Sequence, residues 1–277
     1  DMPVGSSRIM HAHRSDLLLL LAAVLPAACG LAAPALPSPK AVVSIELDGI
    51  LWDSVGVRNG VRSELQDWLR LRVDDAPILD VYEQFDALKA GGAEFGFMVP
   101  GVTEIMRESV KLAISSAELG EAEEAEVCNE ALSTWLQSHD YWAELLLDTE
   151  ATSVLEALRT RGIAVCAISS SIGSTERMPS LASLVDWTAS TYDLISPAAL
   201  MVDLALQVAQ MARYAPGVPW IYVGGATEGG IPQAVAARGV RSIGVGYVGD
   251  LMEGGDAQPD ARVASLSDLV ETVDELL

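Results

Sequence analysis

One stretch decides the fold: Ala41-Val-Val-Ser-Ile-Glu-Leu-Asp-Gly-Ile-Leu-Trp-Asp53. It opens with a continuous apolar run rich in β-branched residues, and then places Glu46 and Asp48 one residue apart before a turn at Gly49. Such a run is typical of a strand buried in a parallel sheet, with the acids at its carboxyl end. Ligands of open α/β sheets bind beyond the carboxyl ends of the strands. Glu46 and Asp48 are therefore candidate site residues.

Downstream of Asp148 the sequence alternates between strand and helix patterns. Strands are predicted at 163–169, 220–223 and 242–246, a short strand or turn at 192–195, and helices at 152–161, 181–187, 198–213, 229–238 and 265–277. Ser265 or Ser267 is the expected N-cap of the last helix. Alternation of this kind predicts a parallel sheet with right-handed crossovers, so the fold class is α/β with a Rossmann-like core.

A long helical segment interrupts this core. Val61, Leu65, Trp68 and Leu69 have the spacing of an amphipathic helix from 57 to 73, and no strand-like alternation follows before about 145. We therefore expect a helical cap at 57–146 inserted between two parts of the core, 40–56 and 147–277.

The first 39 residues have the composition of a targeting segment or membrane anchor followed by a proline-containing linker. No charged residue occurs from Leu17 to Pro39, and the densest apolar part, 17–33, is about the shortest length that spans a bilayer. A cleavable signal ending near Ala32-Ala33-Pro34-Ala35 and a retained anchor both fit this pattern. A buried core helix and a lipoprotein signal at Ala27-Ala28-Cys29 are further alternatives.

The charge of the chain limits its partners. The 277 residues include 39 acids against 17 bases, which gives a formal net charge of −22. Nucleic-acid binding depends on Lys and Arg that neutralise phosphates, so we expect no nucleic-acid partner. The three cysteines and three histidines show neither metal-ligand spacing nor a disulfide framework.

The order of four motifs resembles the haloacid dehalogenase (HAD) superfamily. Glu46 to Asp53 is similar to its first motif, Ser169 to its second, Ser196-Pro197 to its third, and Tyr222-Val-Gly-Gly225 to its fourth. The resemblance covers about residues 41 to 250, and a helical cap between the first two motifs looks like the phosphoglycolate-phosphatase branch. It implies a nucleophilic Asp, an acid/base Asp, a phosphate-binding hydroxyl and lysine, and carboxylate-held Mg²⁺.

This sequence departs from that pattern at several positions together. Glu46 replaces the nucleophilic Asp, Ser196 stands where the family has lysine, and Gly225 stands where it has a metal-binding acid. Asp48 and Ser169 match the pattern, so Glu46, Asp48 and Ser169 are vestigial catalytic positions in this interpretation. The only metal set left would be Glu46, Asp48 and Glu228, which is poor for Mg²⁺.

These departures predict a catalytically inactive HAD-like protein with a structural or binding role and no cofactor. The alternative is a Mg²⁺-dependent phosphatase acting on a small phosphorylated metabolite, with Glu46 as nucleophile and Asp48 as acid/base. A third possibility is a sensor that binds an organic phosphate without hydrolysing it.

A second resemblance concerns the cellular location and the partners of the protein. Asp86-Ala-Leu-Lys-Ala-Gly-Gly92 is similar to a cap stretch of a cyanobacterial and plastid branch of the same group. That resemblance implies a plastid location, at the thylakoid membrane or in the lumen, and protein partners such as a photosynthetic membrane complex. Attachment to the membrane would then depend on residues 17–33 being retained. A secreted or periplasmic protein is the alternative.

Overall fold

The computed structural model describes residues 38–73, 77–90, 101–169, 175–190, 217–225, 235, 239–246 and 258–277. The chain divides into two units, Asp1–Ser38 and Pro39–Leu277, and the description below concerns the second. The expected helices at 198–213 and 229–238 and the expected strand or turn at 192–195 fall largely outside the described residues, as do residues 17–33. Within the described ranges, no helix is long and apolar enough to cross a membrane.

A parallel sheet of six strands forms the core of the described chain. The strands are β1 (Ala41–Glu46), β2 (Ile163–Ser169), β3 (Trp187–Ser190), β4 (Trp220–Gly225), β5 (Arg241–Val245) and β6 (Ala261–Val263). Their order in the sheet is β3-β2-β1-β4-β5-β6, and every neighbouring pair is parallel. The order reverses at β1, so the Rossmann-like α/β prediction is confirmed and β1 flanks the switch point of the sheet.

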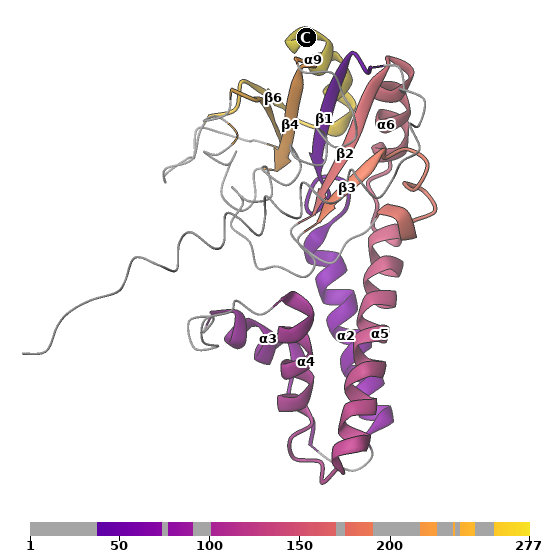
Figure 1. Ribbon diagram of the computed structural model, residues 1–277, viewed down its shortest axis with the longest axis vertical. Helices are drawn as coiled ribbons and strands as arrows, with labels where there is room; N and C mark the ends of the chain where they lie inside the picture. Colours follow the sequence, from indigo (N-terminus) through magenta and orange to yellow (C-terminus); the bar gives the residue numbers. More distant parts are fainter. Residues whose placement is uncertain are drawn as a thin grey trace, which may run out of the picture. The chain divides into compact units, whose positions relative to one another are not determined.

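Burial explains why the central strands read as apolar runs. All seven residues of β2 are buried, and β1 is buried up to Glu46, because a strand in the middle of a covered sheet has no solvent face. On one side, helix α6 (Ala151–Thr160) packs against β2, and the C-terminal helix α9 (Leu269–Leu276) packs against α6 and β6 (Figure 1). An ion pair of 2.8 Å between Arg161 and Asp274 joins these two helices.

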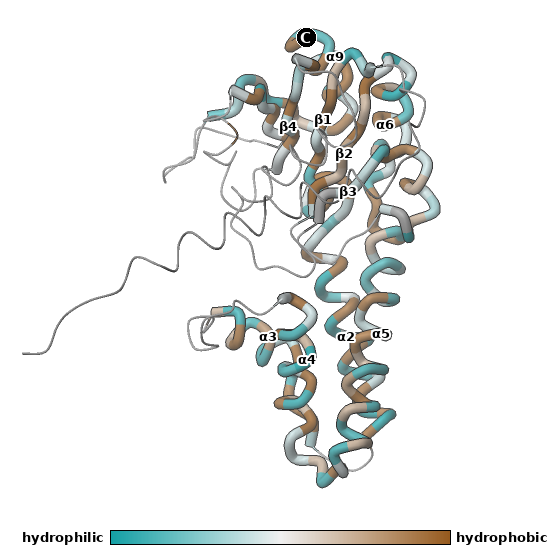
Figure 2. Tube along the Cα trace, viewed as in Figure 1, coloured by the Kyte–Doolittle hydropathy of each residue, from teal (hydrophilic) through white to brown (hydrophobic). Residues whose placement is uncertain are grey.

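Four helices fill the described part of the predicted cap. They are α2 (Ser54–Arg72), α3 (Val81–Ala90), α4 (Val102–Ala113) and α5 (Glu121–Leu145). Helices α2 and α5 lie side by side, and hydrophobic and hydrophilic residues alternate along both (Figures 1 and 2). The alternation is the amphipathic pattern of helices that bury one face against a partner. The expected absence of strands holds for the described residues between 57 and 146.

Glycines allow α2 and α5 to approach closely near the core. A Cβ atom added at Gly60 would lie 2.3 to 2.8 Å from three ring atoms of Trp142, and one added at Gly56 would lie 2.8 Å from Leu146. The Trp142 indole also donates a hydrogen bond of 3.0 Å to Glu64 on α2. The Trp142 ring therefore packs directly against the backbone of α2 at Gly60, and any larger side chain at that position would clash with the ring.

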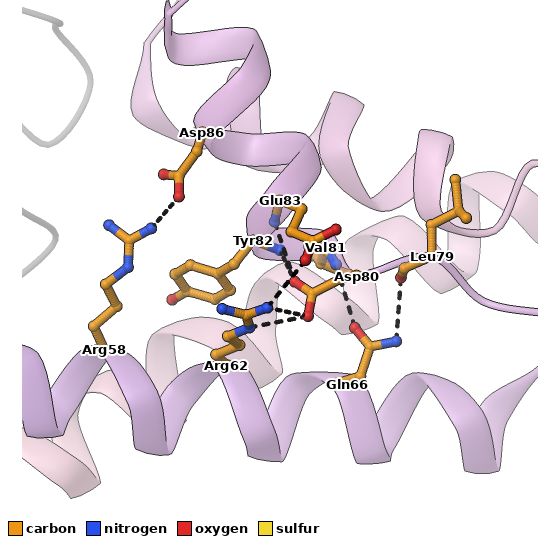
Figure 3. Close-up of polar contacts among 9 residues, drawn as sticks. All are labelled: Arg58, Arg62, Gln66, Leu79, Asp80, Val81, Tyr82, Glu83 and Asp86. Carbon is orange, nitrogen blue, oxygen red and sulfur yellow. Dashed lines mark hydrogen bonds and ion pairs between the residues drawn. The ribbon is translucent and has the colours of Figure 1, made fainter.

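Polar side chains of α2 hold the start of α3 (Figure 3). The Asp80 carboxylate accepts hydrogen bonds from the N–H groups of Tyr82 and Glu83, and so caps α3, while Arg62 donates two bonds of 2.9 and 2.6 Å to it. Burial works against the charge of Asp80, but these bonds outweigh burial and hold the pKa of Asp80 below its usual value. The guanidinium of Arg58 pairs with Asp86 and lies 5.3 Å from the Tyr82 ring centre.

Two local predictions near the C-terminal half are wrong. Residues 181–187 do not form a helix, because the Asp186 carboxylate and N–H group both bond to the backbone of Val165 and draw the chain into β3 beside β2. Neither Ser265 nor Ser267 caps α9. The Ser265 hydroxyl bonds to Ser267 and Asp268 within a 3₁₀ turn, η2 (Leu266–Asp268), and the α-helix begins only at Leu269.

Candidate functional site

The turn after β1 places two acids at the carboxyl edge of the sheet. Gly49 has a φ of 77°, in the left-handed region that favours glycine, and the N–H group of Leu51 bonds back to the carbonyl of Leu47. Trp52 returns beside Asp48 in a bridge, and Asp53 then caps α2 by accepting a bond from the N–H group of Val55. This cap starts α2 at Ser54, three residues before the predicted start.

Glu46 is held against β4. Its Oε1 atom accepts a hydrogen bond from the Tyr222 hydroxyl, and its Oε2 atom accepts one of 3.0 Å from the N–H group of Gly225. A Cβ atom at Gly224 would lie 2.8 Å from Tyr222 and 3.3 Å from Glu46, so a glycine there leaves room for this contact. Both carboxyl oxygens of Glu46 are therefore engaged by the protein.

The surroundings of Glu46 disfavour its charge. Burial raises the pKa of Glu46, the hydrogen bonds from Tyr222 and Gly225 oppose that rise, and the nearby Asp48 adds to it. The net effect is a pKa above the usual value for glutamate. A carboxyl group in this condition is a weaker nucleophile and a weaker metal ligand than an ordinary carboxylate, because both roles require the ionised form.

Asp48 lies on the other side of the turn, toward β2. Its Oδ2 atom accepts a long hydrogen bond of 3.4 Å from the hydroxyl of Ser169, and its Oδ1 atom accepts one of 3.3 Å from the indole of Trp52. Ser169 is fully buried at the end of β2. The structure thus brings the predicted residues Glu46, Asp48 and Ser169 to one edge of the sheet, while Glu228 lies outside the described residues.

Solved structures of known proteins share this architecture. A 2-haloacid dehalogenase from Pseudomonas syringae pv. Tomato DC3000 aligns with a TM-score of 0.64 at 19% identity, covering 86% of this chain and 99% of its own. The HAD-hydrolase YfnB of Bacillus subtilis, solved with magnesium bound, aligns with a TM-score of 0.52 at 10% identity, covering 84% and 98%. This chain has the HAD fold. No protein-family model matches its sequence, and no curated protein matches it significantly.

The resemblance to HAD hydrolases implies Mg²⁺ at the carboxyl edge, and the described residues do not fit that ion. Mg²⁺ requires several oxygen ligands in near-octahedral geometry, several of them supplied by water. Both Glu46 oxygens already accept hydrogen bonds, and Gly225 offers no side-chain oxygen. Within the described ranges, no three His, Cys, Asp or Glu side chains are placed to hold a metal ion.

Sequence reasoning missed Tyr222 as a partner of Glu46. In the sequence it stands out only as part of the stretch similar to the fourth HAD motif. A phenol in a buried strand is nevertheless a signal, because a buried tyrosine hydroxyl usually finds a hydrogen-bond partner. Tyr222 is 3% exposed, and the pairing of β1 with β4, in which Ile45 lies opposite Val223, brings Glu46 within hydrogen-bond distance of its hydroxyl.

Proposed function

We propose that this HAD-fold protein does not catalyse Mg²⁺-dependent phosphoryl transfer and has a structural or binding role. The observation that supports the proposal is the state of Glu46, whose two carboxyl oxygens are bound by Tyr222 and Gly225 and whose pKa is raised. An attacking carboxylate must be ionised and must face the substrate within about 3–3.5 Å. Glu46 instead turns toward β4 and serves as a link between neighbouring strands.

A phosphatase assay on the full chain tests this proposal. The protein is incubated with Mg²⁺ and p-nitrophenyl phosphate, and then with a panel of small phosphorylated metabolites, beside an Asp48→Asn variant. We expect both proteins to release phosphate at the same background rate. Robust turnover by the wild type that Asp48→Asn abolishes would contradict the proposal and would favour the Mg²⁺-dependent phosphatase.

A repaired variant provides a matched control for the assay. Glu46→Asp combined with Gly225→Asp shortens the first acid, removes its bond to Tyr222 and adds a second carboxylate. If the poor fit of the described residues to Mg²⁺ comes from missing ligands, Mg²⁺ stabilises this variant against heat and leaves the wild type unchanged, because a ligand that binds only the folded state raises the melting temperature. Equal stabilisation of the two proteins would count against the explanation.

We also propose a plastid setting with a membrane complex as partner. The support is the similarity of Asp86 to Gly92 to the cyanobacterial and plastid branch, together with the apolar segment 17–33. Carbonate extraction of native membranes, followed by intact-mass measurement of the protein, tests the attachment. Release of a protein that begins after Ala33 would contradict a retained anchor.

A further inference from the structure

Side chains near the C-terminal end of helix α5 contact the core. The ring of His139 meets the ring of Trp52 edge-on, with centroids 6.0 Å apart and planes at 82°. Asp140 forms an ion pair of 2.7 Å with Arg177 of the 3₁₀ turn η1 (Thr175–Arg177), and Glu144 accepts hydrogen bonds from Ser180. The core partners come from the turn after β1 and from the segment after β2.

His139 is the group in this junction that is least suited to carry a charge. Its side chain is 7% exposed, and its Nδ1 atom is buried without a hydrogen-bond partner. Burial, and secondarily the positive charge of Arg177, lower the pKa of His139 to about 4. The neutral ring therefore packs against Trp52, whereas a protonated ring would place a charge in an apolar contact.

Two acids of α5 lie in the described part of the junction, and both are engaged by the core: Glu144 accepts hydrogen bonds from Ser180 through Oε1, and Asp140 pairs with Arg177. Asp140, beside His139 on α5, already receives two bonds from Arg177, of 3.0 Å to Oδ1 and 2.7 Å to Oδ2. From the core, Trp52 presents an uncharged ring and Arg177 presents a like charge. Asp48 lies beyond the indole of Trp52 and accepts its N–H group at 3.3 Å. The ring of Trp52 thus separates His139 from the acids of the candidate site.

We propose that His139, Trp52 and the Asp140–Arg177 ion pair form a latch between α5 and the core, closed while His139 is neutral and opened when His139 takes up a proton. Protonation adds a second positive charge near Arg177 and leaves a buried charge on a ring whose Nδ1 atom has no hydrogen-bond partner, and both effects disfavour the closed arrangement. Because the Trp52 indole also bonds to Asp48, opening the latch changes the surroundings of Asp48 as well. This latch is independent of whether the protein catalyses a reaction.

Fluorine NMR of the full chain with 5-fluorotryptophan tests the latch. The resonance of Trp52 is assigned by its loss in Trp52→Phe, and the pH is lowered from 7.5 to 3.5 while far-UV circular dichroism is followed. We expect the Trp52 signal to shift with a midpoint near pH 4 while the helical signal is retained. In His139→Gln the shift is absent, and in Arg177→Gln the midpoint moves to higher pH because the like charge is gone.

Three results would overturn the latch. The first is a Trp52 shift that persists in His139→Gln, and the second is a midpoint near 6.5, the ordinary value for histidine. The third is a shift that coincides with loss of the helical signal, which would mark general unfolding. If His139→Gln does not fold, the comparison of wild type with Arg177→Gln decides, and an unchanged or lower midpoint in Arg177→Gln refutes the proposal.

Discussion

Replacing Gly60 with alanine tests the close packing of α2 on α5. In an exposed helix this change stabilises a protein by about 0.5–1 kcal/mol, because alanine loses less backbone freedom on folding. At Gly60 the new methyl carbon would instead lie 2.3 Å from Cδ2, 2.4 Å from Cε2 and 2.8 Å from Cε3 of Trp142. Carbon atoms do not approach so closely, so the indole or one of the helices must move.

The size of the effect follows from two opposing contributions. Inserting a methyl group into a closely packed contact costs about 1–3 kcal/mol, and moving the indole also strains its hydrogen bond to Glu64. Subtracting the intrinsic gain of alanine leaves a net loss of about 1–2 kcal/mol in the free energy of unfolding. Packing therefore outweighs helix propensity at this position.

Urea unfolding of the full chain measures this loss. For a slope of about 3 kcal/mol per molar, the midpoint of Gly60→Ala falls by roughly 0.5 M. The control is the same change in a Trp142→Leu background, where the ring is absent and alanine is neutral or stabilising, so a double-mutant cycle isolates the contact. A midpoint that stays constant or rises while Trp142 is present would refute the packing argument.

Three further predictions concern single charged or titratable groups. Because the pKa of His139 is lowered from 6.5 to about 4, the unfolded chain takes up a proton at a higher pH than the folded chain does. The free energy of unfolding should therefore fall by up to ~3 kcal/mol as the pH drops from about 6.5 to 4. Thermal melts across this range should show a melting temperature that depends less on pH in His139→Gln than in the wild type. Glu46→Gln keeps a hydrogen-bond partner for Tyr222 and for the Gly225 N–H group but carries no buried charge. The melting temperature of this variant at pH 8 should therefore equal or exceed that of the wild type. A clearly lower melting temperature would be inconsistent with the raised pKa of Glu46. Asp80→Ala removes the cap of α3 and should cost about 1–2 kcal/mol in urea unfolding, whereas loss of the exposed Asp86 carboxylate should cost less than about 1 kcal/mol.

The strongest sequence patterns predicted the core well. The strand predicted at 163–169 is confirmed at both ends as β2, and the apolar runs that contain β1 and β4 mark central strands. These strands are covered on both faces, so their residues are selected for burial and read as continuous apolar runs. By contrast, β6 has the sequence Ala-Arg-Val at the sheet edge, with one buried residue, and has no pattern that distinguishes it from a loop.

The candidate site was predicted in part. The identity of Glu46, Asp48 and Ser169 follows from sequence, because strand ends gather at one edge of a parallel sheet. The orientation of Glu46 does not, since it depends on Tyr222 and Gly225, which are far away in the chain and adjacent only after β4 pairs with β1. Likewise, the contact of His139 with Trp52 joins helix α5 to the turn after β1. No pattern in the sequence around either residue predicts that contact.

The central place of β1 has a consequence for how the chain folds. Ala41 pairs with Ile163, and Val42 pairs with Trp220, so β1 finds its two neighbours only after more than 100 further residues have been synthesised for β2 and more than 170 for β4. Contacts so distant in sequence form slowly, whereas helices α2 to α5 make contacts that are nearer in sequence. We therefore expect helices α2 to α5 to pack together while the apolar strand β1 is still unpaired during synthesis, which makes that strand a natural binding site for a chaperone.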